Sequence, residues 1–373
     1  MMETFKLVCP CILGVEGLVA DELRAMGAKN VEPQNGRVIF DGDAIMLARA
    51  NICSRYSERV LVLLGIFQAH TFEELFQGIK ALPWEQWIGK NDIFPVKGHS
   101  LSSQLSSVPD CQKIIKKAVV ERLKKKYHVN WFAESDTLYQ IQFLILKDQV
   151  SVMLDTSGAG LHKRGYRANS TQAPIKETLA AAMAHLSRVR INGNMVDPFC
   201  GSGTVLIESA LYALNIAPGL RRHFTAENWD QIDENVWIKE KERAQDLVRR
   251  DAKFRGWGFD IDGAAVSLTI QNAKKAGVIG CLKVEQRAIC DFYTQTDTGV
   301  VVCNPPYGER LLDIKQAQEL YKTMGEVFEQ KHGWSYAVIS PDEMFEIYYG
   351  RKADKRRKLY NGMIKCQLYM YFK

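Results

Sequence analysis

Residues 299–307 read Gly-Val-Val-Val-Cys-Asn-Pro-Pro-Tyr, an apolar run that leads directly into a proline-rich turn. The run predicts a buried strand, and Pro305 and Pro306 then fix the backbone and remove two N–H donors. The side-chain oxygen of Asn304 and the carbonyl of Pro305 can accept both hydrogens of a planar amino group and steer its lone pair toward an electrophile. Tyr307 offers a ring on which an extruded base can stack. The alternative interpretation is a strand followed by an ordinary Asn-Pro turn.

A second motif lies about 100 residues upstream, where residues 197–204 read Asp-Pro-Phe-Cys-Gly-Ser-Gly-Thr. A short apolar run precedes it and helical spacing follows it, which predicts a strand, a glycine-rich turn and a helix N-terminus. Backbone can approach a ligand closely at such a turn. Leu206 stands where a dinucleotide fingerprint requires its third glycine, and the Gly-Lys-Ser/Thr end of a P-loop is missing. A Gly-x-Gly turn alone is a weak signal, but an acidic residue before it together with the later Asn-Pro-Pro-Tyr is a specific combination.

This pair of motifs resembles motifs I and IV of the class I S-adenosylmethionine-dependent amino-methyltransferases. Residues 256–262 (Gly-Trp-Gly-Phe-Asp-Ile-Asp) resemble the second strand of that family, and residues 285–292 (Glu-Gln-Arg-Ala-Ile-Cys-Asp-Phe) resemble the third. The resemblance implies S-adenosyl-L-methionine as cofactor and S-adenosyl-L-homocysteine as product. It also implies that the Asp260 carboxylate binds the ribose hydroxyls, that Ile261 lies against adenine, and that Asp291 accepts from the adenine amino group.

Residues 173–180 resemble motif X of the same family, which lies near the methionine end of the cofactor. Simpler interpretations compete with parts of this site: Asp260 or Asp262 can be a turn or helix-cap acid, and Cys200 and Cys303 suit small buried positions better than nucleophilic ones. The catalytic candidates are Asn304, Pro305, Pro306 and Tyr307. The cofactor-binding candidates are Lys176, Glu177, Thr178, Asp197, Phe199, Cys200, Gly201, Ser202, Gly203, Thr204, Asp260, Ile261, Asp291, Phe292 and Asn304.

Strand patterns and helical patterns alternate over residues 158–373, which predicts a mostly parallel sheet with helices on both faces and a ligand at the carboxyl ends of the strands. Asp197, Asp260, Asp291 and Asn304 each end a predicted strand. With the antiparallel last strand that the resemblance implies, the fold class is a Rossmann-like α/β methyltransferase domain. The predicted strands cover 195–197, 255–260, 282–287, 299–303, 334–340 and 364–372, and the predicted helices cover 178–188, 204–214, 263–277 and 314–330.

Two segments of this region fall outside the alternation. Residues 217–255 predict a helical insertion at the edge of the pocket, with a charged helix over 236–250 whose charges are mostly solvated. The basic run at 350–358 is either an RNA-contacting loop or a solvated hairpin tip before the last strand.

The first 155 residues carry none of these motifs and predict an α+β region. A helix over 110–127, with Asp110 as its N-cap, carries seven basic residues against the single acid Glu121. Such charge suits phosphate groups, although a cationic helix is more often a solvated face. Short strands are predicted at 5–10, 31–32, 36–40 and 59–65, helices at 15–26, 43–51 and 69–81, and a strand, helix, strand and strand over 94–153.

Residues 94–101 and 109–118 resemble a THUMP domain, an RNA-binding module found beside tRNA and rRNA modification enzymes. The junction at 161–167 (Leu-His-Lys-Arg-Gly-Tyr-Arg) also matches such enzymes, and its three cations and one aromatic ring suit a phosphate backbone and a stacked base. The alternative is a basic interdomain linker. The RNA-binding candidates are Lys113, Lys116, Lys117, Lys124, Lys163, Arg164, Tyr166 and Arg167.

Nearly the whole chain resembles the bacterial 23S rRNA guanine-N2-methyltransferases, in a form without a second, fused methyltransferase half. The resemblance implies a ferredoxin-like region at 1–65, a THUMP domain at 66–157 and a methyltransferase domain at 158–373, with 23S rRNA or a large-subunit precursor as partner. Methylation of a tRNA guanosine, of adenine N6 in nucleic acid or of a protein glutamine stays open, as does a non-catalytic RNA-binding role in ribosome assembly.

Composition agrees with an intracellular nucleic-acid enzyme of two or three domains. The chain has 373 residues and a formal net charge of +6, which suits a polyanionic partner without requiring one. Its nine cysteines and seven histidines show no metal-ligand spacing, so no metal is expected and the thiols suit a reducing cytoplasm. No signal peptide and no apolar run of membrane-spanning length is apparent, so no membrane partner is expected.

Overall fold

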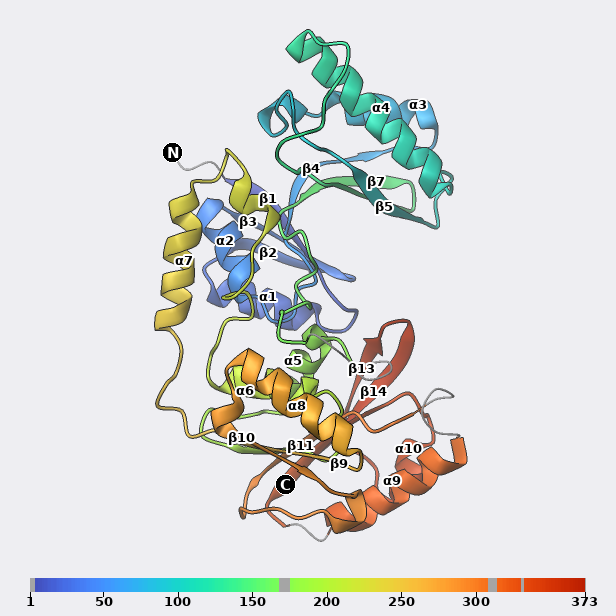
Figure 1. Cartoon of the computed structure of the whole chain (residues 1–373). Helices are drawn as coiled ribbons and strands as arrows, with labels where there is room; N and C mark the ends of the chain where they lie inside the picture. The colour runs from blue at the N-terminus through green and yellow to red at the C-terminus, as the bar shows by residue number, and fades with distance from the viewer. Residues whose placement is uncertain (1–3, 168–174, 308–313, 330–331, 373) are drawn as a thin grey trace.

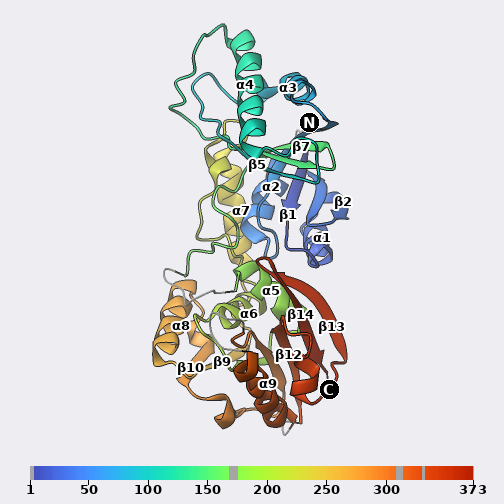
Figure 2. The ribbon, with the colours of Figure 1, turned by 90° about the vertical axis from the view of Figure 1, so that its right-hand side faces the viewer.

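The computed structural model describes residues 4–167, 175–307, 314–329 and 332–372, which form an N-terminal half stacked on a C-terminal half (Figures 1 and 2). Each half is built on its own seven-stranded sheet. Among the described residues, no helix is both long and apolar enough to cross a membrane.

The N-terminal half begins with the strand–helix–strand–strand–helix–strand order of a ferredoxin-like fold. Its sheet runs in the order β2-β3-β1-β4-β7-β6-β5, and all neighbouring strands are antiparallel except the β5–β6 pair. The elements are β1 (Phe5–Pro10), α1 (Glu16–Ala25), β2 (Lys29–Gln34), β3 (Arg37–Gly42), α2 (Ala44–Cys53), β4 (Leu61–Gln68), α3 (Phe72–Ala81), η1 (Trp84–Gln86), β5 (Val96–Leu101), α4 (Val108–Tyr127), β6 (Ile141–Leu146) and β7 (Gln149–Asp155).

Strand β4 joins the two parts of this half into one sheet. It pairs with β1 through Leu7 and Val62, and along its whole length with β7. The boundary that we expect near residue 65 therefore falls inside a strand that both parts share.

The basic helix α4 begins earlier than the sequence predicts. Its first residue is Val108, and Ser107 occupies the N-cap position, so the prediction of Asp110 as N-cap is wrong. Pro109 lies in the first turn, where its missing N–H is not needed by the helix. Asp110 instead accepts a hydrogen bond from the Ser107 hydroxyl at 2.6 Å.

The C-terminal half is the expected α/β layer structure. Strands β10, β9, β8, β11 and β12 are parallel neighbours, and β14 and β13 extend the sheet by antiparallel pairing. Helices α6 and α8 lie on one face and α9 and α10 on the other (Figure 1). The strands are β8 (Asn194–Asp197), β9 (Arg255–Asp260), β10 (Leu282–Gln286), β11 (Gly299–Cys303), β12 (Trp334–Ser340), β13 (Lys355–Asn361) and β14 (Ile364–Tyr371); the helices are α5 (Glu177–Leu186), α6 (Thr204–Ala213), α7 (Glu234–Asp246), α8 (Gly263–Ala276), α9 (Ile314–Glu329) and α10 (Phe345–Tyr349), with short 3-10 turns η2 (Thr225–Asn228), η3 (Ile279–Cys281) and η4 (Ile289–Asp291).

The alternation of side chains along β11 explains why both faces of this sheet are covered. Val300 and Val302 join the core cluster that contains the residues of α5 and α6, whereas Val301 and Cys303 join the cluster beneath α9 and α10. A strand buried on both faces has no polar position until it ends, which is where the polar turn begins.

The insertion at 217–255 lies against the N-terminal half, so its predicted place at the edge of the pocket is wrong. Its helix α7 packs on α2, where both oxygens of the buried Glu240 accept from the Arg49 guanidinium at 2.8 and 2.9 Å. The N–H of Gly219 also donates to the carbonyl of Ile52 at 2.8 Å. A buried carboxylate requires such cationic partners, and Arg49 of α2 supplies one in addition to Arg243 of α7 itself, whose Nε donates to Glu240 at 2.7 Å.

The basic run at 350–358 is not a hairpin tip. Its second part, 355–358, belongs to β13, and the tip of the β13–β14 hairpin lies at Gly362 and Met363. All three of its arginines are engaged within the protein: Arg351 lies 3.3 Å from Asp354, Arg356 pairs with Glu346, and Arg357 donates to the carbonyl of Gly14 at 3.0 Å.

Candidate active site

The carboxyl ends of three neighbouring strands bring the polar motif residues to one edge of the sheet. Asp197 ends β8, Asp260 ends β9, and Asn304 directly follows β11. Asp291 departs from the prediction, because it does not end β10 but lies beyond it, exposed, in the 3-10 turn η4. Since β9, β8 and β11 are adjacent and parallel, the first three side chains share one edge.

The glycine-rich turn of the first motif is locked onto the end of β9. Gly201 and Gly203 have φ angles of +53° and +82°, which L side chains rarely adopt. The N–H of Gly201 donates to Asp260 Oδ2 at 2.9 Å. A Cβ on Gly203 would lie 2.7 Å from Cγ2 of Thr269, so this position excludes side chains for space as well. The backbone of this turn is therefore not covered by side chains at the two glycines, and it lies next to the Asp260 carboxylate, which can accept hydrogen bonds.

Asp260 and Ile261 together fit a nucleoside. The second oxygen of Asp260 accepts from the N–H of Asp262 at 3.0 Å, which fixes the carboxylate in place. The Ile261 side chain next to it is 74% exposed, so an apolar surface stands uncovered at the site. Asp262 is the N-cap of α8 and accepts from Ala264 N at 2.8 Å, which confirms the helix-cap interpretation for that residue.

The carboxyl group of Asp197 is buried and nearly without partners. It accepts from the N–H of Phe199 at 3.1 Å. Burial raises the pKa of Asp197 to about 8, and the nearby charge of Asp260 adds to the increase. A buried carboxyl group in this condition is stabilised as an anion when a cation binds beside it. Such a cation is what the amino-acid end of the implied cofactor would provide.

The side chain of Asn304 presents a buried acceptor with no partner. Its Oδ1 has no hydrogen-bond partner within the described part of the chain, and the next residue, Pro305, is buried and cannot donate. An unpaired buried polar atom costs about 1–3 kcal/mol, so its presence needs a reason. A ligand that donates an N–H to this oxygen would remove the cost.

Tyr307 is held by the C-terminal hairpin. Its hydroxyl accepts from Nδ2 of Asn361 at 2.8 Å and lies 4.0 Å from the sulfur of Cys366. Burial raises the pKa of the Tyr307 hydroxyl well above its usual value. Asn361 is a site residue that sequence reasoning missed, because nothing in the local sequence links residue 361 to residue 307.

Several predicted cofactor residues have buried side chains that serve the protein interior. The buried Phe292 ring packs edge-on against Phe328 with the ring centroids 5.1 Å apart, so this side chain is part of the core. Cys200 is buried as expected, and burial raises its thiol pKa. The side chains of Ser202 and Thr204 are buried with their hydroxyls 3.2 Å apart, while the partly buried Phe199 packs against the core cluster beneath α9 and α10. These residues can contact a cofactor mainly through their backbone.

Two of the three motif X candidates, Lys176 and Thr178, use their side chains on the N-terminal half, which leaves their backbone for a cofactor. The Lys176 ammonium and the Thr178 hydroxyl both contact the Glu58 carboxylate, at 3.0 and 2.6 Å. Glu177 is buried and pairs with Arg167 at 3.1 Å. Burial opposes ionisation of Glu58, but hydrogen bonds from His162 and Thr178 and the charge of Lys176 lower its pKa to about 2.

The junction at 161–167 is mostly closed to a macromolecule. Arg164 and Tyr166 are buried, and both side chains surround the buried Glu208: the Tyr166 hydroxyl donates to it at 3.0 Å. Their predicted role as RNA contacts is therefore wrong, because the Arg164 guanidinium and the Tyr166 hydroxyl both interact with the Glu208 carboxylate inside the protein. Arg167 is half-buried against Glu177, and Lys163 is exposed.

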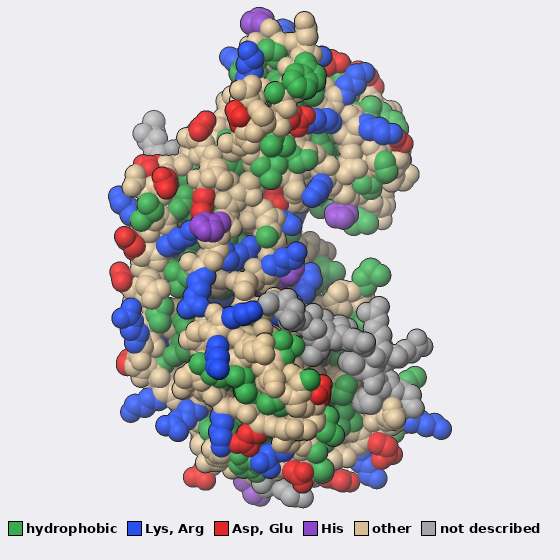
Figure 3. Space-filling model, viewed as in Figure 1, with side chains coloured by type: hydrophobic (Ala, Val, Ile, Leu, Met, Phe, Trp, Pro, Cys, Tyr) green, Lys and Arg blue, Asp and Glu red, His purple; other side chains and the backbone are tan. Residues whose placement is uncertain are grey.

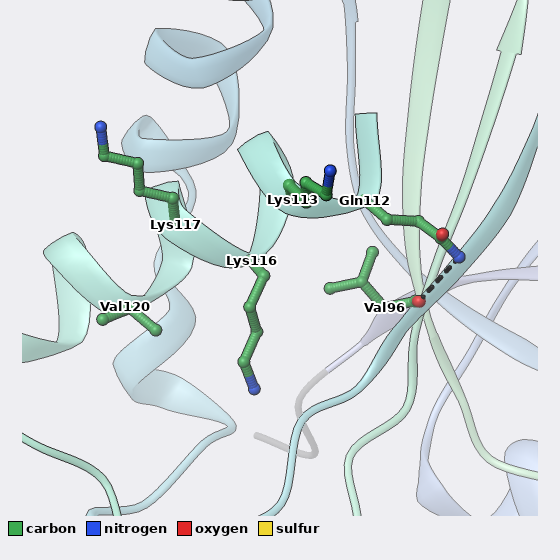
Figure 4. A pocket seen from close by; sticks show the side chains of 6 residues that line it. All are labelled: Val96, Gln112, Lys113, Lys116, Lys117 and Val120. Carbon is green, nitrogen blue, oxygen red and sulfur yellow. Dashed lines mark hydrogen bonds between the residues drawn. The ribbon is translucent and has the colours of Figure 1, made fainter. Parts of the chain in front are cut away.

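A basic surface lies on α4, away from the polar strand ends. A shallow cavity of about 500 Å³ is lined by Val96, Gln112, Lys113, Lys116, Lys117 and Val120 (Figure 4). Lys113 and Lys117 are exposed, as is Lys124 further along the helix. Lys116 already has partners within the protein, since its ammonium lies 2.7 Å from the Glu134 carboxylate and over the Phe94 ring, so it is less available for phosphate than its exposed neighbours. Figure 3 shows further Lys and Arg side chains across the middle of the molecule. Among the described residues, no cluster of His, Cys, Asp or Glu could hold a metal ion.

Comparison with protein families divides the chain into three matches. Residues 6–61 match the RlmL ferredoxin-like domain, residues 69–155 match the THUMP domain, and residues 164–370 match the RMKL-like methyltransferase domain. The matches and the two sheets agree with the predicted fold class.

Among curated proteins, the chain is 43% identical over 373 residues to the Bacillus subtilis protein named "Putative RNA methyltransferase YpsC", covering all of this chain and 97% of that one. It is 31% identical to the ribosomal RNA large subunit methyltransferase K/L of Shewanella amazonensis, covering 96% of this chain but 52% of the relative. The chain thus spans about half the length of the K/L relatives.

Two solved structures are similar over nearly their full length. One is a putative methyltransferase complexed with SAH, with a TM-score of 0.94 and 42% identity, covering all of this chain and 99% of that one. The other, from Listeria monocytogenes, is described as a predicted N6-adenine-specific DNA methylase and has a TM-score of 0.93 and 44% identity, covering 99% of this chain and 96% of that one.

Proposed function

The chain belongs to the RMKL-like methyltransferase family, and we propose that it transfers a methyl group from S-adenosyl-L-methionine to the exocyclic N2 amino group of a guanosine in 23S rRNA. The observation that carries the proposal is the unpaired, buried Oδ1 of Asn304 at the strand edge that also holds Asp197 and Asp260. A pair of acceptors there, Asn304 Oδ1 and the Pro305 carbonyl, suits an amino group, which has two N–H donors, whereas a hydroxyl has only one donor and a carbon nucleophile has none.

The residues of this chain mainly hold and orient the two reactants. Asn304 Oδ1 and the Pro305 carbonyl accept hydrogen bonds from the two N–H groups of the target amine, which fixes the amine and directs its lone pair toward the methyl group. The Tyr307 ring, fixed by Asn361, supports the face of the base. The bound cofactor supplies a methyl group on a sulfonium, which is already an activated electrophile. The amine loses its proton to water after transfer, so no strong general base is required.

We assign the cofactor to the edge formed by β8 and β9. Asp260 receives the ribose hydroxyls, Ile261 covers one face of adenine, and the exposed Asp291 accepts from the adenine amino group. The buried carboxyl group of Asp197 faces the α-ammonium group of the amino-acid end, whose positive charge favours the ionised form of the carboxyl group. Gly201 and Gly203 allow the backbone to approach the cofactor closely.

The choice of RNA over DNA rests on the N-terminal half and on relatives. A THUMP domain match at 69–155 and the names of the Bacillus and Shewanella relatives favour RNA. We assign residues 158–373 to the catalytic unit. We assign phosphate contacts to exposed lysines of α4 and of the junction at 161–167. The contacts are Lys113, Lys117, Lys124 and Lys163.

A second candidate function is methylation of adenine N6 in nucleic acid. The observation that favours it is the description of the Listeria relative, at 44% identity, as a predicted N6-adenine-specific DNA methylase. Transfer of labelled methyl groups from S-adenosyl-L-methionine to rRNA, tRNA, duplex DNA and protein separates the candidates. The rRNA should come from cells that lack this protein, and mass spectrometry of that rRNA should show one N2-methylguanosine missing. Labelling of DNA alone, or of rRNA on adenine, would refute the guanine proposal.

A further inference from the structure

The hairpin that joins β13 to β14 carries an apolar side chain at its very tip. Asn361 and Ile364 face each other as the last pair of the hairpin, and Gly362, with φ +63°, and Met363 form the turn between them. The Met363 side chain is 98% exposed, and Ile364 is 50% exposed. Burial does not explain a methionine here, and polar residues would make the same turn at no cost in solubility.

This tip lies directly beside the Asn-Pro-Pro-Tyr tetrad, residues 304–307. Asn361, which immediately precedes the turn, donates from Nδ2 to the Tyr307 hydroxyl at 2.8 Å, and Cys366 on the returning strand lies 4.0 Å from the same hydroxyl. The side chain that would support the target base is therefore fastened to the hairpin whose next residues are Gly362 and Met363. A base seated on Tyr307 would leave its own strand close to this tip.

The hairpin is rigid enough to act as a fixed projection. Seven consecutive residues of β13 pair with β14, and Leu359 is fully buried. Arg357 donates to the Gly14 carbonyl at 3.0 Å, which ties the hairpin to the N-terminal half. The free end of the hairpin projects from the C-terminal half toward the N-terminal half (Figures 1 and 2), and the surface is hollowed on that side (Figure 3).

The charges around the tip suit a polyanion. Lys358 and Lys365 are exposed on the two strands that lead to and from the turn, and Lys365 has a loose contact of 3.7 Å with the exposed Glu343. An apolar projection between two cations matches a base stack bordered by phosphates, whereas a protein or lipid partner would call for a broader apolar face.

We propose that Met363 is a wedge that enters the RNA base stack at the place the target nucleotide leaves, with Lys358 and Lys365 on the flanking phosphates. This rests on the proposed function, because it concerns how the same site gains access to a paired or stacked base. Proteins that unstack nucleic acids insert methionine, leucine or isoleucine in this way, and the inserted side chain offsets part of the unstacking cost.

The test compares Met363→Ala with Met363→Leu, which keeps an apolar wedge, and with Ile347→Ala as a matched control. Ile347 is 68% exposed in α10 and lies outside the tetrad and the hairpin. Single-turnover methyl transfer is measured first on rRNA from cells lacking the protein. It is then measured on an RNA hairpin containing the mapped guanine, either paired or opposite an abasic site, and calorimetry with S-adenosyl-L-homocysteine checks the cofactor pocket.

We expect Met363→Ala to lower the transfer rate on the paired substrate about tenfold or more, and to recover to within about twofold of wild type opposite the abasic site, where unstacking is easier. Met363→Leu and Ile347→Ala should stay within about twofold on both substrates, and cofactor affinity should not change. An unchanged Met363→Ala rate on the paired substrate, or an equal loss on both, overturns the wedge while leaving the methyltransferase intact. Absence of transfer by the wild-type protein to any RNA overturns the proposed function and the wedge together.

Discussion

Replacing the buried carboxyl group at the end of β8 by an amide, Asp197→Asn, should remove a pH-dependent cost from the cofactor-free protein. Burial raises the pKa of Asp197 from 3.8 to about 8. When burial raises the pKa of a carboxyl group, the folded protein holds the proton more tightly than the unfolded chain does. The resulting stabilisation is fully present below the pKa of the unfolded chain and is lost as the pH rises through the pKa of the folded protein. The pH window for the effect is therefore about 4 to 8.

The magnitude follows from the size of the shift. Moving the pKa from 3.8 to about 8 corresponds to a free-energy difference of about 6 kcal/mol, and the slope is about 1.4 kcal/mol per pH unit. The asparagine keeps the acceptor for the Phe199 N–H at 3.1 Å but cannot titrate. The free energy of unfolding of the variant relative to wild type should therefore rise by about 4 kcal/mol between pH 5 and pH 8.

Urea denaturation of both proteins at several pH values between these limits measures the difference. Because groups distant from Asp197 titrate equally in the two proteins, the difference between the two curves reports on Asp197 and on its coupling to Asp260. A cation bound beside Asp197 would lower its pKa, so saturating S-adenosyl-L-methionine should flatten the wild-type curve, and calorimetry in two buffers should detect nearly one proton released near pH 7. Parallel curves for wild type and variant would refute the reasoning.

Three further substitutions separate the parts of the site. Asn304→Ala should lower turnover about a hundredfold or more and leave the cofactor dissociation constant within about twofold, because its oxygen acts on the target amine; equal losses in both would remove that role. Asp260→Ala should weaken cofactor binding in calorimetry by about tenfold or more, since it removes the ribose acceptor and the partner of the Gly201 N–H, and unchanged affinity would contradict the assignment. Glu58→Gln should lower the free energy of unfolding near pH 7 by about 3 kcal/mol, because the pKa of Glu58 is lowered from 4.5 to about 2. The stabilising effect of a depressed pKa is present above about pH 4.5 and lost as pH falls toward 2, so the two proteins should converge in thermal unfolding at acid pH, and a constant difference would count against the ion pairs with Lys176.

The sequence by itself determined the strands that carry the motifs. The predicted bounds of β9, β11 and β12 agree with the structure to the residue, since each has a mainly apolar or glycine-containing centre and ends at a polar residue or a turn. A strand covered on both faces has to be apolar until it emerges, so the motif residues Asp260 and Asn304 mark the strand ends directly. The resemblance of the motifs at Asp197, Asp260 and Asn304 to those of the class I amino-methyltransferases also predicted the methyltransferase fold that the family comparison confirms.

Only the tertiary structure decided which side chains are free to act. From the sequence, Arg164 and Tyr166 are expected at the surface, yet both side chains are buried against the Glu208 carboxylate. The hydroxyl of Tyr166 donates to that carboxylate, which lies 42 residues away in the sequence. The link from Asn361 to Tyr307 likewise spans 54 residues. Local periodicity reports whether a residue lies in a strand or a helix, but the partner of a buried charge or hydroxyl is set by packing between distant elements, which no local pattern encodes.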